Sequence, residues 1–166
     1  MSCKMVCPFC SIVCDGRMHP IGVMATSSNS PQRSQNFSIE QLPGISQENC
    51  QTLIKAGIKT THQLLRCAHD LRQQQQLANQ LHIHTQYIQK WAALANLSQV
   101  PSVGCQYCGL LLHAGIATPQ QLAIASLPKL HRQVMKLHIA TMQTKQYCPS
   151  LELVSTWIQN AQRFRR

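Results

Sequence analysis

Apolar residues recur every three or four positions along most of this chain, which is the spacing of one face of an α-helix. Strand-like alternation of apolar and polar residues does not occur in the pattern. The sequence therefore predicts an all-α fold. The expected helices start at the Ser46 cap and at its counterpart in the second half of the chain, and otherwise cover residues 61–68, 70–80, 85–97, 119–126, 127–143 and 151–163.

This pattern occurs twice in the chain. Residues 42–65, LPGISQENCQTLIKAGIKTTHQLL, return without a gap as VPSVGCQYCGLLLHAGIATPQQLA at 100–123. Farther along, YIQKWAALAN resembles LVSTWIQNAQ, so Trp91 corresponds to Trp157. Self-similarity on this scale predicts a duplicated supersecondary unit. Both tryptophans have apolar neighbours at helical spacing, which favours core anchors over base-stacking platforms.

Turn and capping residues mark the helix ends in both copies. Gly57 and Gly115 each precede an isoleucine, as is typical of a helix that ends in a left-handed conformation. Thr60-x-x-Gln63 and its counterpart Thr118-x-x-Gln121 have the form of a capping box. Each pair predicts a new helix that begins at the residue after the threonine.

Composition divides the chain into a tail, a linker and two units. Residues 25–36, ATSSNSPQRSQN, carry Ser, Asn, Pro and Gln without apolar periodicity, which is typical of a flexible linker. The linker separates a Cys-rich tail, residues 1–24, from a folded body that we expect to begin near Phe37. Within the body, the repeat defines unit 1 as residues 37–98 and unit 2 as residues 99–166. We expect the units to share one body, because each has only about 60 residues.

The chain is basic because acids are scarce. Its 166 residues include 15 Lys and Arg but only five Asp and Glu, which gives a net charge of +10. No acid occurs from Leu71 through Leu151. In the expected 127–143 helix, the apolar positions are Leu127, Leu130, Val134 and Leu137, and the cations on another face are Lys129, Arg132 and Lys136. This face is either a solvated surface or one that follows the phosphate backbone of a polyanion such as DNA.

Residues 42–58 resemble the helix-hairpin-helix motif, in which an apolar-Pro-Gly-apolar-Gly turn leads into a helix. With the linking AGI-x-T and a Trp helix in each unit, residues 37–166 resemble an uncharacterised bacterial family of tandem helix-hairpin-helix domains. The resemblance implies that backbone N–H groups at a helix start hold a phosphate oxygen of nucleic acid. The residues so implicated are Gly44, Ile45 and Ser46 in the first copy and Val103 and Gly104 in the second.

Each copy of the motif lacks one glycine. Ser46 stands where the second glycine is expected in copy one, and Ser102 replaces the first glycine in copy two. These replacements weaken the expected phosphate contact, and a purely structural or protein-docking use of the turns is an equal alternative.

Two of the nine cysteines occupy equivalent repeat positions. Cys50 and Cys108 fall on the helix faces that carry Leu53 and Leu111, so we expect both thiols in the core. An inward Cys108 argues against the pair Cys105-x-x-Cys108 as a metal clip.

Four other cysteines crowd the N-terminal tail, in the order Cys3, Cys7, Cys10 and Cys14. Several close thiolates on one loop suit an iron–sulfur cluster, while zinc with His19 as a spare ligand, or no metal, are the alternatives. The stretch CPFCSIVCD resembles the cluster-binding segment of formylmethanofuran dehydrogenase B-type subunits, which implies the cluster. The spacing also fits the radical S-adenosylmethionine signature, but no barrel-sized domain follows.

The sequence shows no grouping of nucleophile, base and orienting residue, so we expect no enzyme. An odd number of cysteines without a regular framework favours a reducing cytoplasm, and no segment approaches the roughly 20 apolar residues that span a bilayer. The resulting hypothesis is a DNA-binding protein without base specificity. The alternatives are a protein-docking adaptor and a metal-dependent redox or sensing accessory protein.

Overall fold

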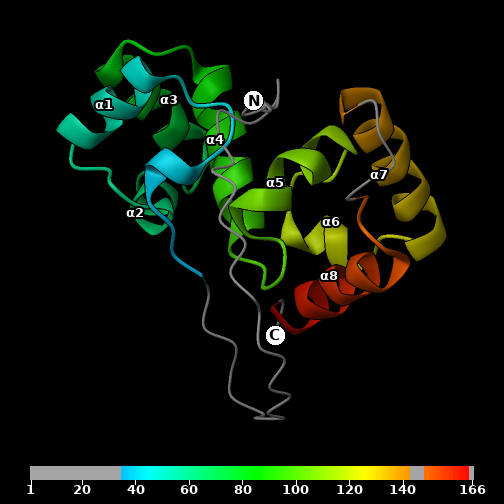
Figure 1. Cartoon of the computed structure of the whole chain (residues 1–166). Coiled ribbons are helices and arrows are strands. Elements are labelled where there is room, and N and C mark those ends of the chain that lie inside the picture. The colour runs from blue at the N-terminus through cyan, green and yellow to red at the C-terminus, as the bar shows by residue number, and fades with distance from the viewer. Residues whose placement is uncertain (1–34, 143–147, 165–166) are drawn as a thin grey trace, which may run out of the picture.

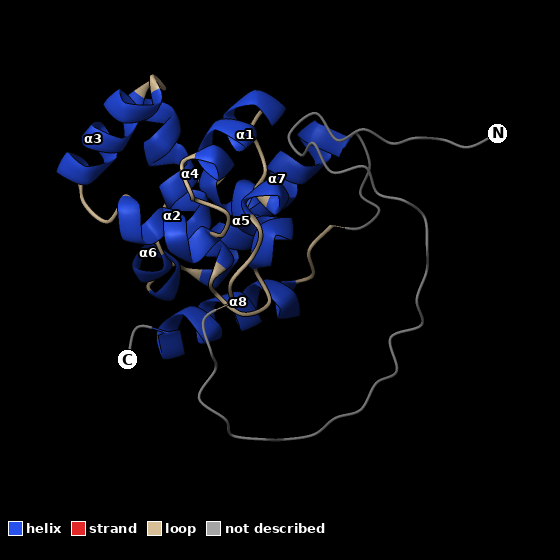
Figure 2. Ribbon diagram, turned by 90° about the vertical axis from the view of Figure 1, so that its left-hand side faces the viewer, coloured by secondary structure: helices blue, strands red, loops and turns tan. Residues whose placement is uncertain are grey.

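The helices of the computed structural model follow the apolar periodicity of the sequence (Figure 1). The structure describes residues 35–142 and 148–164. Within these ranges the regular elements are helices and no strand is present, which confirms the all-α prediction (Figure 2). The elements are η1 (Ile39–Gln41), α1 (Gln47–Lys55), α2 (Thr61–Cys67), α3 (Leu71–Leu81), α4 (Thr85–Ser98), α5 (Gly104–His113), α6 (Pro119–Ala123), α7 (Leu127–Met142) and α8 (Leu151–Phe164).

One helix is shorter than the sequence predicts. A helix was expected over residues 119–126, but α6 ends at Ala123 and Ile124 is its C-cap. Pro128 in the first turn of α7 accounts for the break, because proline fits the start of a helix but its ring blocks a preceding helical turn. The break leaves the Ile124 side chain 75% exposed.

The two glycines that follow α1 and α5 have the same backbone conformation. Gly57 and Gly115 both have a φ angle of 85°. Beyond them, the N–H of Ile58 donates to the Leu53 carbonyl at 2.9 Å, and the N–H of Ile116 donates to the Leu111 carbonyl at 3.0 Å. This pairing is the Schellman motif, and it confirms that both helices end in a left-handed residue.

Replacing either glycine by alanine is expected to lower the free energy of unfolding by about 1 kcal/mol or more. Apart from the adjacent residues, no group among the described residues lies within 4 Å of a Cβ at Gly57 or Gly115, so the loss would come from backbone strain and not from a clash. Denaturant titration of Gly57→Ala and Gly115→Ala measures it. Gly57→Asn is the matched control, because asparagine tolerates this conformation better than alanine. Unchanged stability in both alanine variants would contradict the assignment.

The last helix of each repeat holds the turn at the start of that repeat. The indole N–H of Trp91 donates to the Gly44 carbonyl at 3.3 Å, and the indole N–H of Trp157 donates to the Ser102 carbonyl at 2.9 Å. Gly44 and Ser102 are equivalent in the repeat, and their φ angles are 75° and 70°. Both indole side chains are fully buried, as expected of core anchors.

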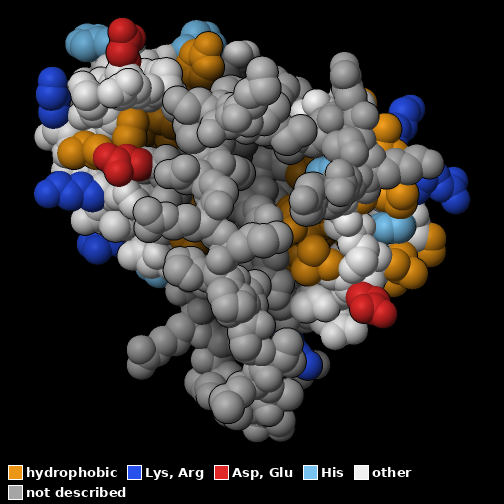
Figure 3. All heavy atoms as spheres, viewed as in Figure 1, with side chains coloured by type: hydrophobic (Ala, Val, Ile, Leu, Met, Phe, Trp, Pro, Cys, Tyr) orange, Lys and Arg blue, Asp and Glu red, His pale blue; other side chains and the backbone are white. Residues whose placement is uncertain are grey.

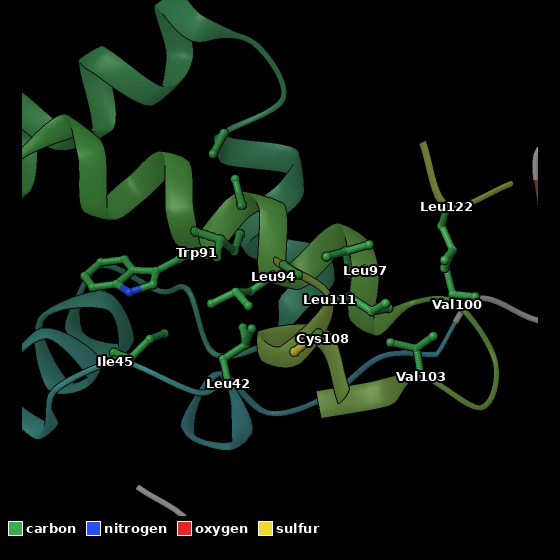
Figure 4. Packing of buried hydrophobic residues seen from close by; sticks show 14 of the residues in the cluster. Leu42, Ile45, Trp91, Leu94, Leu97, Val100, Val103, Cys108, Leu111 and Leu122 are labelled. Carbon is green, nitrogen blue, oxygen red and sulfur yellow. The ribbon is translucent and has the colours of Figure 1, made fainter. Parts of the chain in front are cut away.

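Buried side chains from both halves of the chain form one core around α4 and α5 (Figure 4). Leu94 and Leu97 of α4 belong to the same cluster as Cys108 and Leu111 of α5. The turn before α1 also contacts α5, because the Cγ atom of the buried Pro43 lies 3.4 Å from the position that a Cβ of Gly109 would take. The apolar faces of the two halves therefore cover each other, which is how repeated units of this size reach stability.

The N-terminal segment, residues 35–38, ties α2 to the end of α4. Asn36 Oδ1 accepts from the His62 N–H at 3.2 Å, and the Thr61 N–H donates to the Phe37 carbonyl at 2.9 Å. On the other side, the Gln35 N–H donates to the Gln99 carbonyl at 3.5 Å. These bonds satisfy N–H groups at the start of α2 that would otherwise lack partners.

Candidate nucleic-acid interface

The turn before α1, called turn 1 here (residues 43–46), is open at the start of a helix. Gly44 is exposed and left-handed. Ile45 is only 8% exposed, so it anchors the turn in the core. Ser46 is the exposed N-cap of α1, and its Oγ accepts from the Asn49 N–H at 3.3 Å. Ser46 therefore satisfies one of the N–H groups that a ligand would need.

A lysine from α4 lies over turn 1. The Nζ atom of Lys90 is 3.2 Å from the position that a Cβ of Gly44 would take. Because the neighbouring Trp91 bonds the Gly44 carbonyl, α4 fixes both the turn and the cation. Burial, and after it the positive charge of Lys90, lower the pKa of His113 at the end of α5. His113 is therefore neutral at pH 7, and Lys90 supplies the positive charge at this position.

Turn 1 also has carboxylates in its neighbourhood. Glu48 lies in the first turn of α1. Glu40 of η1 is close enough to α1 that its charge, after burial, helps to raise the pKa of Cys50. An acid in the first turn of a helix interacts with the same N–H groups that attract an anion. The local charge thus favours a single phosphate contact beside Lys90 over a broad basic surface.

The second turn, called turn 2 here (residues 101–104), is bonded to α8. The Asn160 side-chain amide donates to the Pro101 carbonyl at 3.0 Å and to the Ser102 Oγ at 3.2 Å. Asn160 is only 6% exposed, and the indole of Trp157 bonds the same turn. Ser102, which stands in place of a glycine, thus gives its side chain to a bond within the protein.

The N-terminal segment covers the rest of turn 2. A Cβ at Gly104 would lie 3.5 Å from Phe37 Cζ and 3.9 Å from Gln35 Oε1. Val103 is 2% exposed. Turn 2 therefore has the left-handed geometry of turn 1, but the side chains of Phe37 and Gln35 that lie against it are neutral, whereas Lys90 lies against turn 1. This arrangement favours a packing role for Val103 and Gly104.

The basic face lies on α7, as the sequence predicts. The side chains of Lys129, Arg132 and Lys136 are all exposed, whereas Leu130 and Val134 of the same helix are 2% and 0% exposed. Figure 3 shows Lys and Arg side chains at the outer edge of the molecule formed by this helix. The closest acid in the sequence is Glu152, in the first turn of α8.

The candidate residues form three separate groups. Figure 1 places α1 and α7 on opposite sides of the central pair α4 and α5. Turn 1 with Lys90, turn 2 under the N-terminal segment, and the basic face of α7 are therefore distinct surfaces. The sequence alone did not implicate Lys90 or Asn160, because both reach their turns from distant parts of the chain. The repeated tryptophan could have pointed to Lys90, because Lys90 directly precedes Trp91.

The cysteines of the folded body are largely buried. Cys50 and Cys108 are 8% and 0% exposed, which confirms their expected place in the core, and Cys105 is 8% exposed. Among the described residues, no group of three or more His, Cys, Asp or Glu side chains could hold a metal ion. Cys3, Cys7, Cys10 and Cys14 lie outside the described residues, so the structure carries no information on their predicted cluster. Within the described ranges, no helix is long and apolar enough to cross a membrane.

Together these features define an all-α protein with two related proline turns, one beside a lysine and one beside neutral side chains, and a basic helix on a separate surface. Residues 43–164 match the family described as "Domain of unknown function (DUF4332)". The chain belongs to this family. Neither a curated protein nor a solved structure matched it.

Proposed function

We propose that this protein binds the sugar-phosphate backbone of DNA without base specificity and without catalysing a reaction. The observation that carries the proposal is the exposed basic face of α7, formed by Lys129, Arg132 and Lys136 in a region without acids. Cations that contact phosphates position a protein on a duplex but do not read its sequence. We also propose that the protein is cytoplasmic.

Turn 1 supplies a second contact in this proposal, as a helix-hairpin-helix turn would. Its left-handed Gly44 lets a phosphate approach the backbone closely, and Lys90 adds a cation at the same place. We assign no contact to turn 2, because the side chains beside it, Phe37 and Gln35, are neutral and Asn160 bonds the Ser102 hydroxyl. Only one of the two hairpins is thus assigned to the nucleic acid.

The expected salt dependence follows from counterion release. Replacing Lys129, Arg132 and Lys136 together by alanine should weaken binding to duplex DNA and reduce the slope of log affinity against log salt by up to about three. Fluorescence anisotropy over a salt series measures both quantities. All three side chains are exposed, so the folded state should keep its stability.

Two controls separate a local contact from a general loss of charge. The triple variant Lys55→Ala, Lys59→Ala and Arg66→Ala removes the same charge from exposed positions on α1, its following turn and α2, and should leave the slope nearly unchanged. Lys90→Ala should weaken binding, whereas Lys59→Ala should not. If the wild type binds no duplex and no single strand at low salt, the proposal is wrong.

A protein-docking adaptor is the second candidate. Its support comes from turn 2, which is used for packing, and from the exposed apolar side chains of Ile124 and Leu151, which are 75% and 49% exposed. Exposed large apolar residues are more typical of protein interfaces than of phosphate contacts. A third candidate, a redox or sensing accessory protein, depends on a cluster in the N-terminal tail.

A further inference from the structure

Two cysteines lie one turn apart at the start of α5. Gly104 is left-handed with a φ of 54°, so Cys105 follows directly at the beginning of the regular helix. Cα atoms three residues apart in an α-helix are separated by about 5 Å, which is within the range that a disulfide spans. The Cys108 Sγ donates to the Cys105 carbonyl at 3.5 Å. Cys108 therefore points back along the helix toward Cys105.

The start of α5 is suited to a thiolate. The N-caps of α1, α2, α3, α4 and α6 each accept a hydrogen bond from the first turn of their helix. The N-cap of α5 is Val103, which has no side-chain cap. N–H groups at a helix start favour a nearby thiolate. Cys105 is 8% exposed and Cys108 is fully buried, so we assign the first attack on a reagent to Cys105.

We propose that Cys105 and Cys108 form a redox-active dithiol that closes to a disulfide within α5 on reaction with a low-molecular-weight disulfide. The Cys105 thiolate attacks one sulfur of the reagent, forms a mixed disulfide and releases the other half as a thiolate. Cys108 then loses its proton and attacks the Cys105 sulfur, which releases the second half. Two electrons and two protons pass from the protein dithiol to the reagent, which leaves as two thiols.

The repeat provides an internal control. Cys50 holds in α1 the position that Cys108 holds in α5, but Gln47 stands where the second copy has Cys105. Burial, and after it the charge of Glu40, raise the pKa of Cys50. Cys50 thus has no neighbouring thiol at this spacing and is a poor thiolate. If Cys105 and Cys108 oxidise more readily than Cys50, the difference is therefore due to the pairing of the two thiols in α5.

Peptide mapping of the reduced full-length protein tests the proposal. The protein is equilibrated with mixtures of reduced and oxidised glutathione, quenched with acid, alkylated under denaturing conditions and digested with trypsin. The peptide from Trp91 to Lys129 contains Cys105 and Cys108 and no other cysteine. It should lose two hydrogens and escape alkylation at an oxidised-to-reduced ratio about tenfold or more below the ratio that modifies Cys50, because the partner thiol is held close by.

Variants identify the roles of the two thiols. Cys108→Ala should trap glutathione on Cys105, and Cys50→Ala should leave the link between Cys105 and Cys108 unchanged. Oxidation should also alter tryptophan fluorescence, because Tyr107 lies between the two cysteines and its ring centroid is 4.9 Å from that of Trp157. The proposal is overturned if both thiols are alkylated under every condition that leaves the protein folded. It is equally overturned if they oxidise no more readily than Cys50.

Discussion

Trp157→Ala is expected to destabilise the protein by about 3–5 kcal/mol, a large part of the stability of a domain this size. The indole is fully buried and its N–H donates to the Ser102 carbonyl at 2.9 Å. Its ring also packs on Tyr107 of α5. Alanine would therefore leave a cavity between α5 and α8 and remove one of the hydrogen bonds between turn 2 and α8. Equilibrium denaturation followed by circular dichroism measures the loss.

The conservative variant separates the hydrogen bond from the volume. Trp157→Phe keeps most of the ring but removes the donor, so it should cost about 1–3 kcal/mol, including the unpaired Ser102 carbonyl. Trp91→Phe is the matched change in the first repeat. Its bond to Gly44 is longer, at 3.3 Å, so the loss there should be smaller. A Trp157→Phe variant as stable as the wild type would show that the indole bond does not hold turn 2.

Local signals were sufficient to predict the helices and their ends. Gly57 and Gly115 are left-handed because only a residue without a Cβ adopts that conformation without strain, so their effect is readable from sequence. Thr60 forms a capping box with Gln63, and Thr118 accepts from the Gln121 N–H at 3.2 Å. Each of these features involves residues within one helical turn. For the same reason, the Pro128 effect on α6 was also within reach of sequence reasoning.

Contacts between distant segments were not predictable in the same way. The two turns look alike in sequence, and each lacks one glycine, yet a cation lies beside turn 1 and neutral side chains lie beside turn 2. What distinguishes them is Asn160 on α8 and Phe37 in the N-terminal segment, both far from turn 2 in the chain. Periodicity and spacing assign a residue to a face but do not state which segment packs on it. The contact between Lys90 of α4 and turn 1 also joins segments that are far apart in the chain, so it was not predictable from local signals.

The different surroundings of the two turns affect how a ligand could bind to them. A duplicated hairpin with both turns open would present two phosphate contacts at fixed separation. Here, turn 1 has Lys90 beside it, and the residue that corresponds to Lys90 in the second repeat is Thr156. The second repeat carries its cations on α7 instead. We therefore expect the two repeats to make different kinds of contact with the same partner.

Anaerobically purified full-length protein is expected to be brown and to contain iron and inorganic sulfide. Cys3, Cys7, Cys10 and Cys14 place four soft ligands within a dozen residues, and such a segment is too short to bury them in a core of its own. The visible absorption should bleach on reduction or exposure to air. Metal analysis and an ultraviolet-visible spectrum of one anaerobic preparation measure both.

Single substitutions distinguish ligands from bystanders. Cys7→Ser or Cys10→Ser should abolish the colour, whereas Cys67→Ser should not, because Cys67 is an exposed cysteine on α2, outside the tail. Stoichiometric zinc in a colourless protein would instead support a closed tetrahedral site, with His19 as a candidate ligand. Colourless anaerobic protein with neither metal would contradict both assignments. The cluster and the dithiol in α5 are proposed on different cysteines, so different variants test them.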